Sequence, residues 1–226
     1  MSGALAIVAA AGSGERLGLG PKAFVEIGGR TILSMTVERV SQVPQVIHVV
    51  VVVPPGSEEV ARSILSAFPA ITVTAGGASR HASVAAGLVV QQPLPERIIV
   101  HDAARPFASL RLFTSVLEAL DGWDGVVPLV SITDTLKRTR EETVIGTEPR
   151  GGLALAQTPQ AFRSPALVEA HRRAGEAAQV FSDDAGCLEW AGFRVRAVPG
   201  EPGNRKITTV EDLRDVGVGT SGDPGG

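Results

Sequence analysis

The sequence predicts an α/β fold: a Rossmann-like, mostly parallel sheet with helices on both faces, plus a protruding β-arm. Short apolar runs alternate with helix-period segments along most of the 226 residues, which is the pattern of a parallel sheet. Between residues 131 and 157 this alternation stops, and polar, β-favouring residues take over. We therefore expect one domain over residues 1–219, with the arm at about 131–157 and a disordered tail at 220–226.

The first half of the chain is predicted to alternate three strands with three helices. Residues 5–10 form a short apolar run that ends at glycines, and 46–53 is almost entirely valine and isoleucine, as in a strand covered on both faces. A third strand is expected at 71–74. Helices are expected at 32–43, 57–68 and 80–90, and the second has its apolar residues on one face: Val60, Ala61, Ile64, Leu65 and Phe68.

The second half continues the pattern around the arm. Strands are expected at 98–100 and 126–130, and Ser109 is a suitable N-cap for the helix between them. Its inward face holds Leu112, Phe113, Val116, Leu117 and Leu120. After the arm we expect helices at 164–178 and 184–191, a strand at 193–198 and a last helix from Thr209.

The arm itself is predicted to be a hairpin, because residues 135–139 and 143–147 flank the charged stretch 140–142. A hairpin buries little on its own and is marginal in isolation. We therefore expect it to pack against another part of the assembly, such as a second subunit.

Composition favours a cytoplasmic globular protein. The formal charge of −3 argues against general nucleic-acid binding, which needs a basic face. The single cysteine, Cys187, excludes an intrachain disulfide and a Cys-based zinc cluster, and the four histidines show no metal-ligand spacing. No run approaches the ~20 apolar residues of a membrane span. Residues 1–11 lack a basic segment and a cleavage site, so we expect a buried strand there and not a signal peptide.

A glycine-rich loop follows the first strand and continues as Gly12-Ser13-Gly14-Glu15-Arg16-Leu17-Gly18, then Pro21-Lys22. Ligands of open α/β sheets bind at the carboxyl ends of the strands, and glycines let backbone N–H groups approach a phosphate. Arg16 and Lys22 would add positive charge. The glycine spacing does not fit a dinucleotide fingerprint, and a lysine after proline does not fit a Walker loop. The loop is therefore a candidate phosphate site, although many glycine-rich turns hold no ligand.

Two further segments could complete a site. Gly76-Gly77-Ala78 precedes a predicted helix that carries Ser83, and such glycines allow close approach to a flat base; alone, this segment is better explained as a turn with a helix cap. His101-Asp102-Ala103-Ala104-Arg105-Pro106 places a carboxylate at a strand end, where it could bind Mg²⁺. The alternative is an Asp–Arg pair that only shapes the turn.

In this order, the three segments resemble the 2-C-methyl-D-erythritol 4-phosphate cytidylyltransferase family of the nucleotidyltransferase superfamily. The similarity extends from about residue 9 to 213 through Asp134-Thr135-Leu136-Lys137, Gln157-Thr158-Pro159-Gln160, Ser182-Asp183-Asp184-Ala185 and Lys206-Ile207-Thr208. It implies an enzyme that joins CTP and 2-C-methyl-D-erythritol 4-phosphate. The products would be 4-diphosphocytidyl-2-C-methyl-D-erythritol and pyrophosphate, in the non-mevalonate route to isoprenoid precursors.

The resemblance also implies roles for individual residues. The catalytic residues would be Arg16, Lys22, Arg150 and Lys206. Nucleotide binding would fall to Ala10, Ala11, Gly12, Gly14, Gly77, Ala78, Ser83 and Asp102. The polyol phosphate would contact Asp102, Arg105, Thr135, Arg150, Thr158 and Lys206. Asp102 would bind the Mg²⁺ cofactor, and the arm would cross to a partner subunit, which implies a homodimer.

Three other functions remain open at this stage. A cytidylyltransferase for another polyol phosphate, such as ribitol 5-phosphate, would share the nucleotide loop. A sugar-nucleotide pyrophosphorylase that uses UTP or GTP would need a longer chain, with room for a large sugar-binding domain. A catalytically silent nucleotide-binding protein would be favoured by loss of the basic loop residues, but Arg16 and Lys22 are both present.

Overall fold

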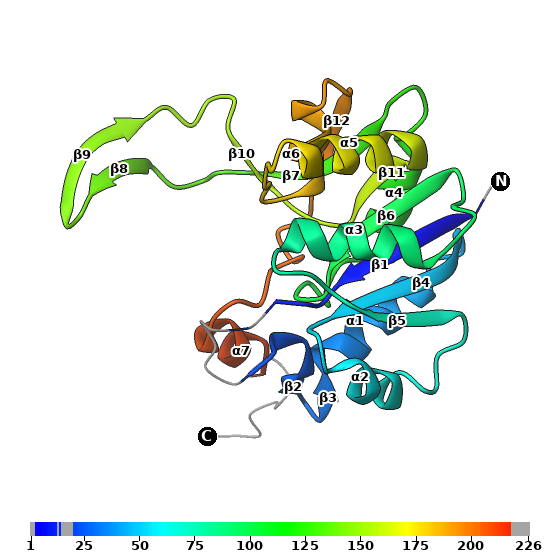
Figure 1. Cartoon of the computed structure of the whole chain (residues 1–226). Coiled ribbons are helices and arrows are strands. Elements are labelled where there is room, and N and C mark those ends of the chain that lie inside the picture. Colours follow the sequence, from blue (N-terminus) through cyan, green and yellow to red (C-terminus); the bar gives the residue numbers. More distant parts are fainter. Residues whose placement is uncertain (1–2, 13, 15–19, 218–226) are drawn as a thin grey trace, which may run out of the picture.

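An eight-stranded sheet runs through the centre of the protein (Figure 1). The computed structural model describes residues 3–12, 14 and 20–217. The main path of the sheet has the order β10 (Ala154–Ala156), β7 (Gly125–Ser131), β11 (Gln160–Arg163), β6 (Arg97–Asp102), β1 (Ala4–Ala9), β4 (Val46–Val53) and β5 (Ile71–Ala75), while β12 (Val195–Pro199) pairs with β7. The strands β6, β1, β4 and β5 are mutually parallel, as the alternation of strands and helices predicts.

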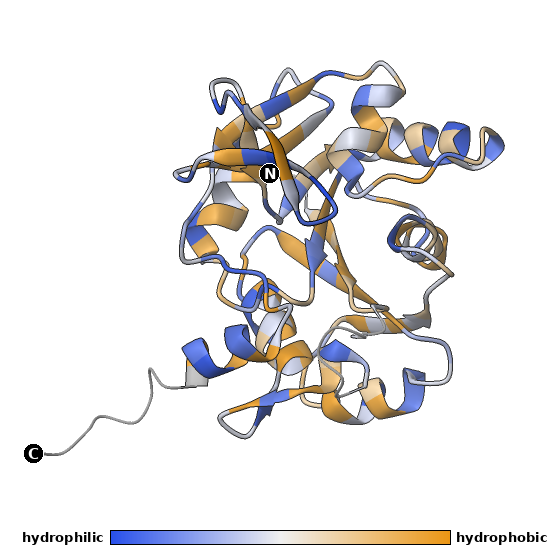
Figure 2. Cartoon of the chain, turned by 90° about the vertical axis from the view of Figure 1, so that its left-hand side faces the viewer, coloured by the Kyte–Doolittle hydropathy of each residue, from blue (hydrophilic) through white to orange (hydrophobic). Residues whose placement is uncertain are grey.

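The central strands contribute to two hydrophobic cores, one on each face of the sheet. Along β1, Ala4, Ala6 and Val8 belong to one core, while Leu5 and Ile7 belong to the other, because successive side chains of a strand point to opposite faces. Figure 2 shows these strands as a hydrophobic layer between helices that are hydrophobic on one side only. The predicted α/β class, with helices on both faces, is confirmed.

The helices divide between the two faces of the sheet. The first core receives α1 (Ile32–Ser41), α2 (Glu58–Ile64) and α4 (Leu110–Glu118), and the second receives α3 (Arg80–Val90), α5 (Ser164–Glu176) and α6 (Asp184–Trp190). Ser109 caps α4 as predicted, since its side chain accepts a hydrogen bond from the Leu112 N–H at 3.0 Å. The last helix, α7, covers Val210–Gly217. Within the described part of the chain, no helix has the length and apolar character of a membrane span.

Two antiparallel strands of the sheet have no counterpart in the sequence prediction. β11 lies between β6 and β7 and runs antiparallel to both, and β10 pairs antiparallel with the other end of β7. Both strands are very short, four and three residues, so they carry too few positions for a period to be visible. A small hairpin of β2 (Glu26–Ile27) and β3 (Arg30–Thr31) was also not predicted, for the same reason.

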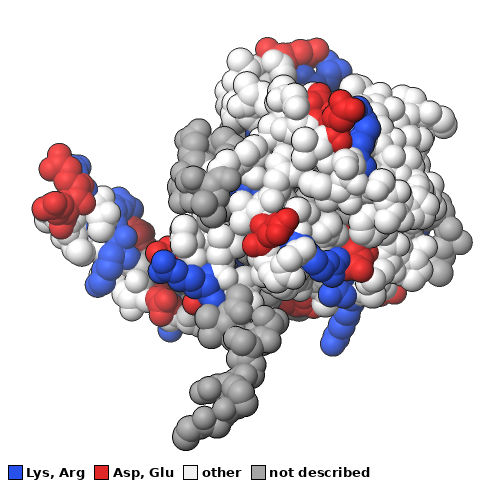
Figure 3. Space-filling view, turned by 90° about the horizontal axis from the view of Figure 1, so that it is seen from below, with Lys and Arg blue, Asp and Glu red and all other residues white. Residues whose placement is uncertain are grey.

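The arm is a separate two-stranded hairpin of β8 (Leu136–Arg140) and β9 (Thr143–Glu148). Figure 1 shows it extending far from the body of the molecule, and Figure 3 shows charges of both signs along it. Several of its large apolar side chains, and those of the chain that leads back to β10, are exposed: Val144, Ile145, Leu153 and Leu155. The predicted tail at 220–226 lies outside the described residues.

Candidate active site

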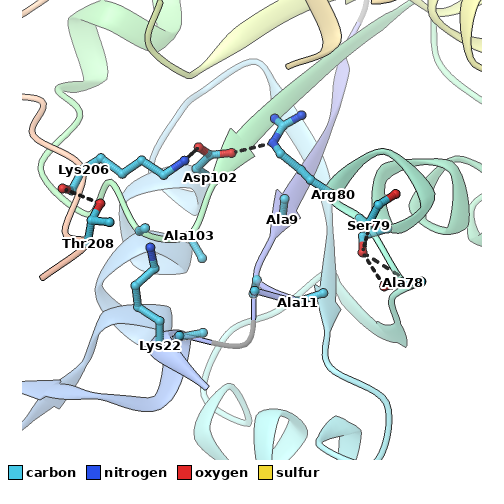
Figure 4. Close-up of a pocket in the computed structure, with 17 residues that line it drawn as sticks. Ala9, Ala11, Lys22, Ala78, Ser79, Arg80, Asp102, Ala103, Lys206 and Thr208 are labelled. Carbon is cyan, nitrogen blue, oxygen red and sulfur yellow. Dashed lines mark hydrogen bonds and ion pairs between the residues drawn. The ribbon is translucent and has the colours of Figure 1, made fainter. Parts of the chain in front are cut away.

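The carboxyl ends of β1 and β6 open into a cavity of about 590 Å³ (Figure 4). Its walls are the loop after β1, the 3₁₀ helix η1 (Lys22–Phe24), the first turn of α3, the end of β6 and the chain after β12. This is the edge at which open α/β sheets bind ligands. Ten predicted site residues line it: Ala10, Ala11, Gly12, Gly14, Lys22, Gly77, Ala78, Ser83, Asp102 and Lys206.

Gly14 fixes the position of Lys22 by close backbone packing. It has a φ of +72°, and a Cβ at this position would lie 2.4 Å from the Gly20 carbonyl oxygen and 2.9 Å from the Lys22 nitrogen. Any side chain here would both strain the backbone and displace the start of η1. The side chain of Lys22 extends from η1 into the cavity (Figure 4), so the glycine loop and the lysine form one unit.

The opposite wall of the cavity is a glycine turn held by Ser83. The Gly77 N–H donates to Ser83 Oγ at 3.2 Å, and Ser83 Oγ donates to the Ser79 carbonyl at 2.8 Å. A Cβ on Gly76 would lie 2.6 Å from both Ala11 Cβ and Ser83 Oγ, which brings the two loops into direct contact. The hydroxyl proton of Ser83 is therefore already used by the backbone, and Ser83 shapes the wall of the cavity.

Asp102 lies between two cations at the floor of the cavity. Lys206 Nζ is 2.8 Å from Oδ2, and Arg80 Nε is 3.0 Å from Oδ1, as the dashed lines in Figure 4 mark. Burial alone would raise the pKa of the Asp102 carboxyl, but Arg80 and Lys206 outweigh burial and hold that pKa well below its usual value. Asp102 is therefore an anion at any working pH, and both cations have a fixed partner.

A second, smaller cavity of about 280 Å³ adjoins the first. Arg80, Asp102 and Lys206 line both cavities, and the second adds the predicted residues Arg105 and Thr158. The rest of its lining includes Gln157, Gln160, Ser182 and Asp183, which the sequence analysis did not assign to the site. The two cavities therefore meet at one carboxylate and two cationic side chains.

His101 connects the elements of the second cavity. The Thr158 hydroxyl accepts from the Asp102 N–H at 3.0 Å and lies 3.0 Å from His101 Nδ1. His101 Nε2 lies 3.1 Å from the Arg105 carbonyl oxygen. A neutral imidazole with its proton on Nε2 satisfies all of these contacts, because it accepts from Thr158 and donates to the carbonyl. His101 thus orients two of the predicted substrate-binding residues.

The buried His101 makes the free energy of unfolding depend on pH. Burial lowers its pKa from 6.5 to about 4, so the unfolded chain binds a proton at a pH at which the folded chain does not. Stability is then lost as pH falls from 6.5 toward 4. We expect a loss of ~2 kcal/mol between about pH 7 and about pH 5, measured by urea unfolding.

In a His101→Gln variant, the part of the pH dependence of the free energy of unfolding that His101 causes should disappear. A smaller slope from His48 and His81 should remain, since their pKa values are also lowered by burial. An unchanged slope in His101→Gln would contradict the assignment.

Arg80 is the main site residue that the sequence analysis did not assign. It donates through Nη1 to Asp184 Oδ2 at 2.6 Å in addition to its contact with Asp102, and Asp184 also lies 2.9 Å from His171 Nε2. Nη2 of Arg80 is buried and has no hydrogen-bond partner in the described part of the chain. Arg80 therefore joins Asp102 to Asp184 at the junction of the cavities.

A family model described as IspD: 2-C-methyl-D-erythritol 4-phosphate cytidylyltransferase matches residues 4–217. The chain belongs to this family. Membership confirms the resemblance inferred from the ordered motifs, and with it the class of nucleotidyltransferase.

Solved members of the cytidylyltransferase family have the same fold. The Thermus thermophilus 2-C-methyl-D-erythritol 4-phosphate cytidylyltransferase is 35% identical, with a TM-score of 0.80 over 96% of this chain and 98% of that chain. The 4-diphosphocytidyl-2C-methyl-D-erythritol synthase of Anaerococcus prevotii is 30% identical, with a TM-score of 0.84 over 96% and 95%. A curated relative from Nitrobacter winogradskyi, named bifunctional enzyme IspD/IspF, is 40% identical over 212 residues, which is 92% of this chain and 53% of that protein. The chain thus spans about half the length of the curated relatives it matches.

The structure leaves three predicted residues of the cytidylyltransferase site without a place at the two cavities, one because it is not described and two because they lie elsewhere. Arg16 lies outside the described residues. Thr135 and Arg150 lie exposed on the arm and line neither cavity. Arg150 donates through Nη1 to the Thr133 carbonyl within the arm. The structure therefore does not bring the arm residues to the cavities of their own chain.

Asp183 and Asp184 have different structural roles. Asp183 caps α6, accepting from the Gly186 N–H at 3.1 Å. Asp184 is 1% exposed and holds both Arg80 and His171. Burial would raise the pKa of Asp184, but Arg80 and His171 outweigh burial and lower it. A two-acid motif at a helix start carries no signal that tells these positions apart, because the role of Asp184 depends on partners that are distant in the sequence.

Proposed function

We propose that this chain transfers the cytidylyl group of CTP to 2-C-methyl-D-erythritol 4-phosphate and releases pyrophosphate. One observation carries the proposal: two cavities of about 590 and 280 Å³ meet at Arg80, Asp102 and Lys206. A reaction between two phosphorylated substrates needs such a junction, where both phosphates can be held beside cations. The larger cavity would hold CTP, and the smaller would hold the polyol phosphate.

The chemistry that these residues would perform is electrostatic. The acceptor phosphate is already an anion, so its oxygen can attack the α-phosphorus of CTP without an enzyme nucleophile or a strong base. The barrier comes from bringing two anions together and from charge that moves onto the leaving pyrophosphate. Lys22, Arg80 and Lys206 line the larger cavity, where they would surround this reaction centre, and fixed cations of this kind stabilise a transition state. Arg105 and Thr158 line the smaller cavity, where they would position the polyol phosphate and so contribute the rest of the rate enhancement.

Mg²⁺ fits the site through Asp102. Each of its carboxylate oxygens has one cationic partner, and each can accept a further contact because a carboxylate has about four acceptor positions. Mg²⁺ on phosphates needs only one or two protein carboxylates. When bound, the ion would offset the negative charge of the triphosphate. Asp102 would hold it, while Lys206 and Arg80 keep the carboxylate in place.

We also propose a homodimer in which the arm completes the partner's site. Thr135 and Arg150 lie outside the cavities of their own chain, and exposed apolar side chains follow the arm. Contact with another molecule would cover these side chains, and a two-stranded hairpin gains stability from such a contact. A cytoplasmic location stays a prediction from the sequence.

The test is pyrophosphate release by the purified protein with Mg²⁺ and CTP. We expect turnover with 2-C-methyl-D-erythritol 4-phosphate, and little with ribitol 5-phosphate or when UTP replaces CTP. Turnover with ribitol 5-phosphate alone would support cytidylyl transfer but identify ribitol 5-phosphate as the acceptor. No turnover with any pair would contradict the proposal and favour a nucleotide-binding protein without catalysis.

A further inference from the structure

Two histidines and the single cysteine lie together on the face of the sheet that α3, α5 and α6 cover. The rings of His81 in α3 and His171 in α5 are stacked, with centroids 4.1 Å apart and planes 5° from parallel. Cys187 in α6 lies beside them, and one donor atom from each of the three residues lies within 4.8 Å of the other two. Three different helices thus bring two imidazoles and a thiol close together.

His171 already has the hydrogen-bonding pattern of a metal ligand. Its Nε2 lies 2.9 Å from Oδ1 of the buried Asp184. Its other ring nitrogen, Nδ1, is buried and has no hydrogen-bond partner among residues 3–12, 14 and 20–217, and the residue is 6% exposed. Metal-bound histidines usually donate to a carboxylate through one nitrogen and bind the ion through the other. A buried nitrogen without a partner costs free energy, and a metal ion would remove this cost.

We propose that His81, His171 and Cys187 form a binding site for a transition-metal cation, with Zn²⁺ the best match. Imidazole nitrogen and thiolate sulfur are the ligands that Zn²⁺ prefers, whereas Mg²⁺ prefers oxygen. This site is therefore separate in chemistry from the one at Asp102. On binding, Cys187 would release its thiol proton to solvent as the sulfur–metal bond forms. The fourth position would be left for water, as in other sites with three protein ligands.

Binding requires a rearrangement of the three side chains. Zn–N distances of ~2.0 Å and a Zn–S distance of ~2.3 Å place tetrahedral ligand atoms roughly 3.5 Å apart, so the atoms must move inward from up to 4.8 Å. The two rings must also leave their parallel stack, because imidazole lone pairs lie in the ring plane. His81 can rotate more easily than His171, since it is 9% exposed and its other ring neighbour, Phe181, is 6.1 Å away.

The first experiment measures metal uptake by the chelator-treated full chain, with excess Mg²⁺ to saturate oxygen sites and a non-thiol reductant. We expect one Zn²⁺ per chain with a Kd of about micromolar or lower. With Co²⁺ as the probe, we expect the near-ultraviolet charge-transfer band of a cobalt–thiolate bond. Free Zn²⁺ at about one hundred times Kd should raise Tm by roughly 5–10 °C. Absence of the cobalt–thiolate band in the folded wild type would overturn the proposal.

Variants then assign the ligands. Cys187→Ser should lose the Co²⁺ band and the Zn²⁺-dependent rise in Tm. His81→Gln, at the most exposed ligand, should weaken Zn²⁺ binding by about tenfold or more while circular dichroism shows an unchanged fold. His48→Gln is the matched control, because His48 is bonded to Thr72 Oγ1 at 2.9 Å and is not one of the three residues. Zn²⁺ affinity that is equal in wild type, Cys187→Ser and His81→Gln would place the ion elsewhere and refute the site.

Discussion

A Lys22→Ala enzyme is expected to lose turnover by on the order of 10²-fold or more, with little change in the KM for CTP. Lys22 extends into the cavity from η1, on the side where Asp102 and Lys206 meet (Figure 4). In the proposed reaction its charge acts most strongly when negative charge moves onto the leaving group, so its loss raises the barrier more than it weakens substrate binding. A hundredfold loss in kcat corresponds to about 2.7 kcal/mol. Steady-state pyrophosphate release measures both constants.

A matched control removes a positive charge far from the cavities. Arg62→Ala is suitable, because Arg62 lies exposed on α2 and lines neither cavity. It should keep wild-type kcat and KM. Normal kcat in Lys22→Ala would refute the assigned role, and a rise in KM alone would make Lys22 a binding residue only.

Mixing Lys22→Ala with Arg150→Ala is expected to restore activity that neither variant has alone. If the arm serves the partner's site, a mixed dimer contains one site with its own Lys22 and the partner's intact arm. The other site of that dimer carries both defects. Random exchange of subunits should then return about a quarter of the wild-type sites. The measurement is pyrophosphate release after co-refolding or slow exchange of the two inactive variants.

The control for mixing is a chain that carries both substitutions, Lys22→Ala and Arg150→Ala. Mixed with Lys22→Ala, it should stay inactive, because no chain then supplies an intact Lys22. Activity that stays at the level of the separate variants, in a sample shown to contain mixed dimers, would mean that Arg150 serves its own chain. A protein that sediments as a monomer at assay concentration would contradict the dimer itself.

The sequence predicts the parallel half of the fold and the cavity loops well, because both leave local marks. Val46–Val53 is long and apolar enough to identify a buried strand, and Gly14 and Gly77 stand where the backbone must pass close to another segment. Short β11 carries no comparable mark, although it is central to the sheet. Its place depends on hydrogen bonds to β6 and β7, which only the tertiary structure supplies.

Within the site, too, local sequence patterns reveal some residues and miss others. Asp102 is visible in the sequence because it ends a strand at the ligand-binding edge. Arg80 is the first residue of a helix capped by Ser79, which has an ordinary local explanation; its contacts with Asp102 and Asp184 join positions far apart in the chain. Likewise, His81, His171 and Cys187 show no ligand spacing because each comes from a different helix. Local spacing rules find sites built on one segment and miss sites assembled from several.

The antiparallel strand β11 has a consequence for the order in which the protein can fold during synthesis. The first 102 residues contain β1, β4, β5 and β6 with α1, α2 and α3, enough for a parallel sheet with helices on both faces. In that state one edge of β6 has no partner until residues 160–163 emerge from the ribosome, and an open apolar edge invites pairing with other chains. Lys206 joins Asp102 later still. This edge of β6 would therefore stay open until β11 is made, and catalytic competence would come last.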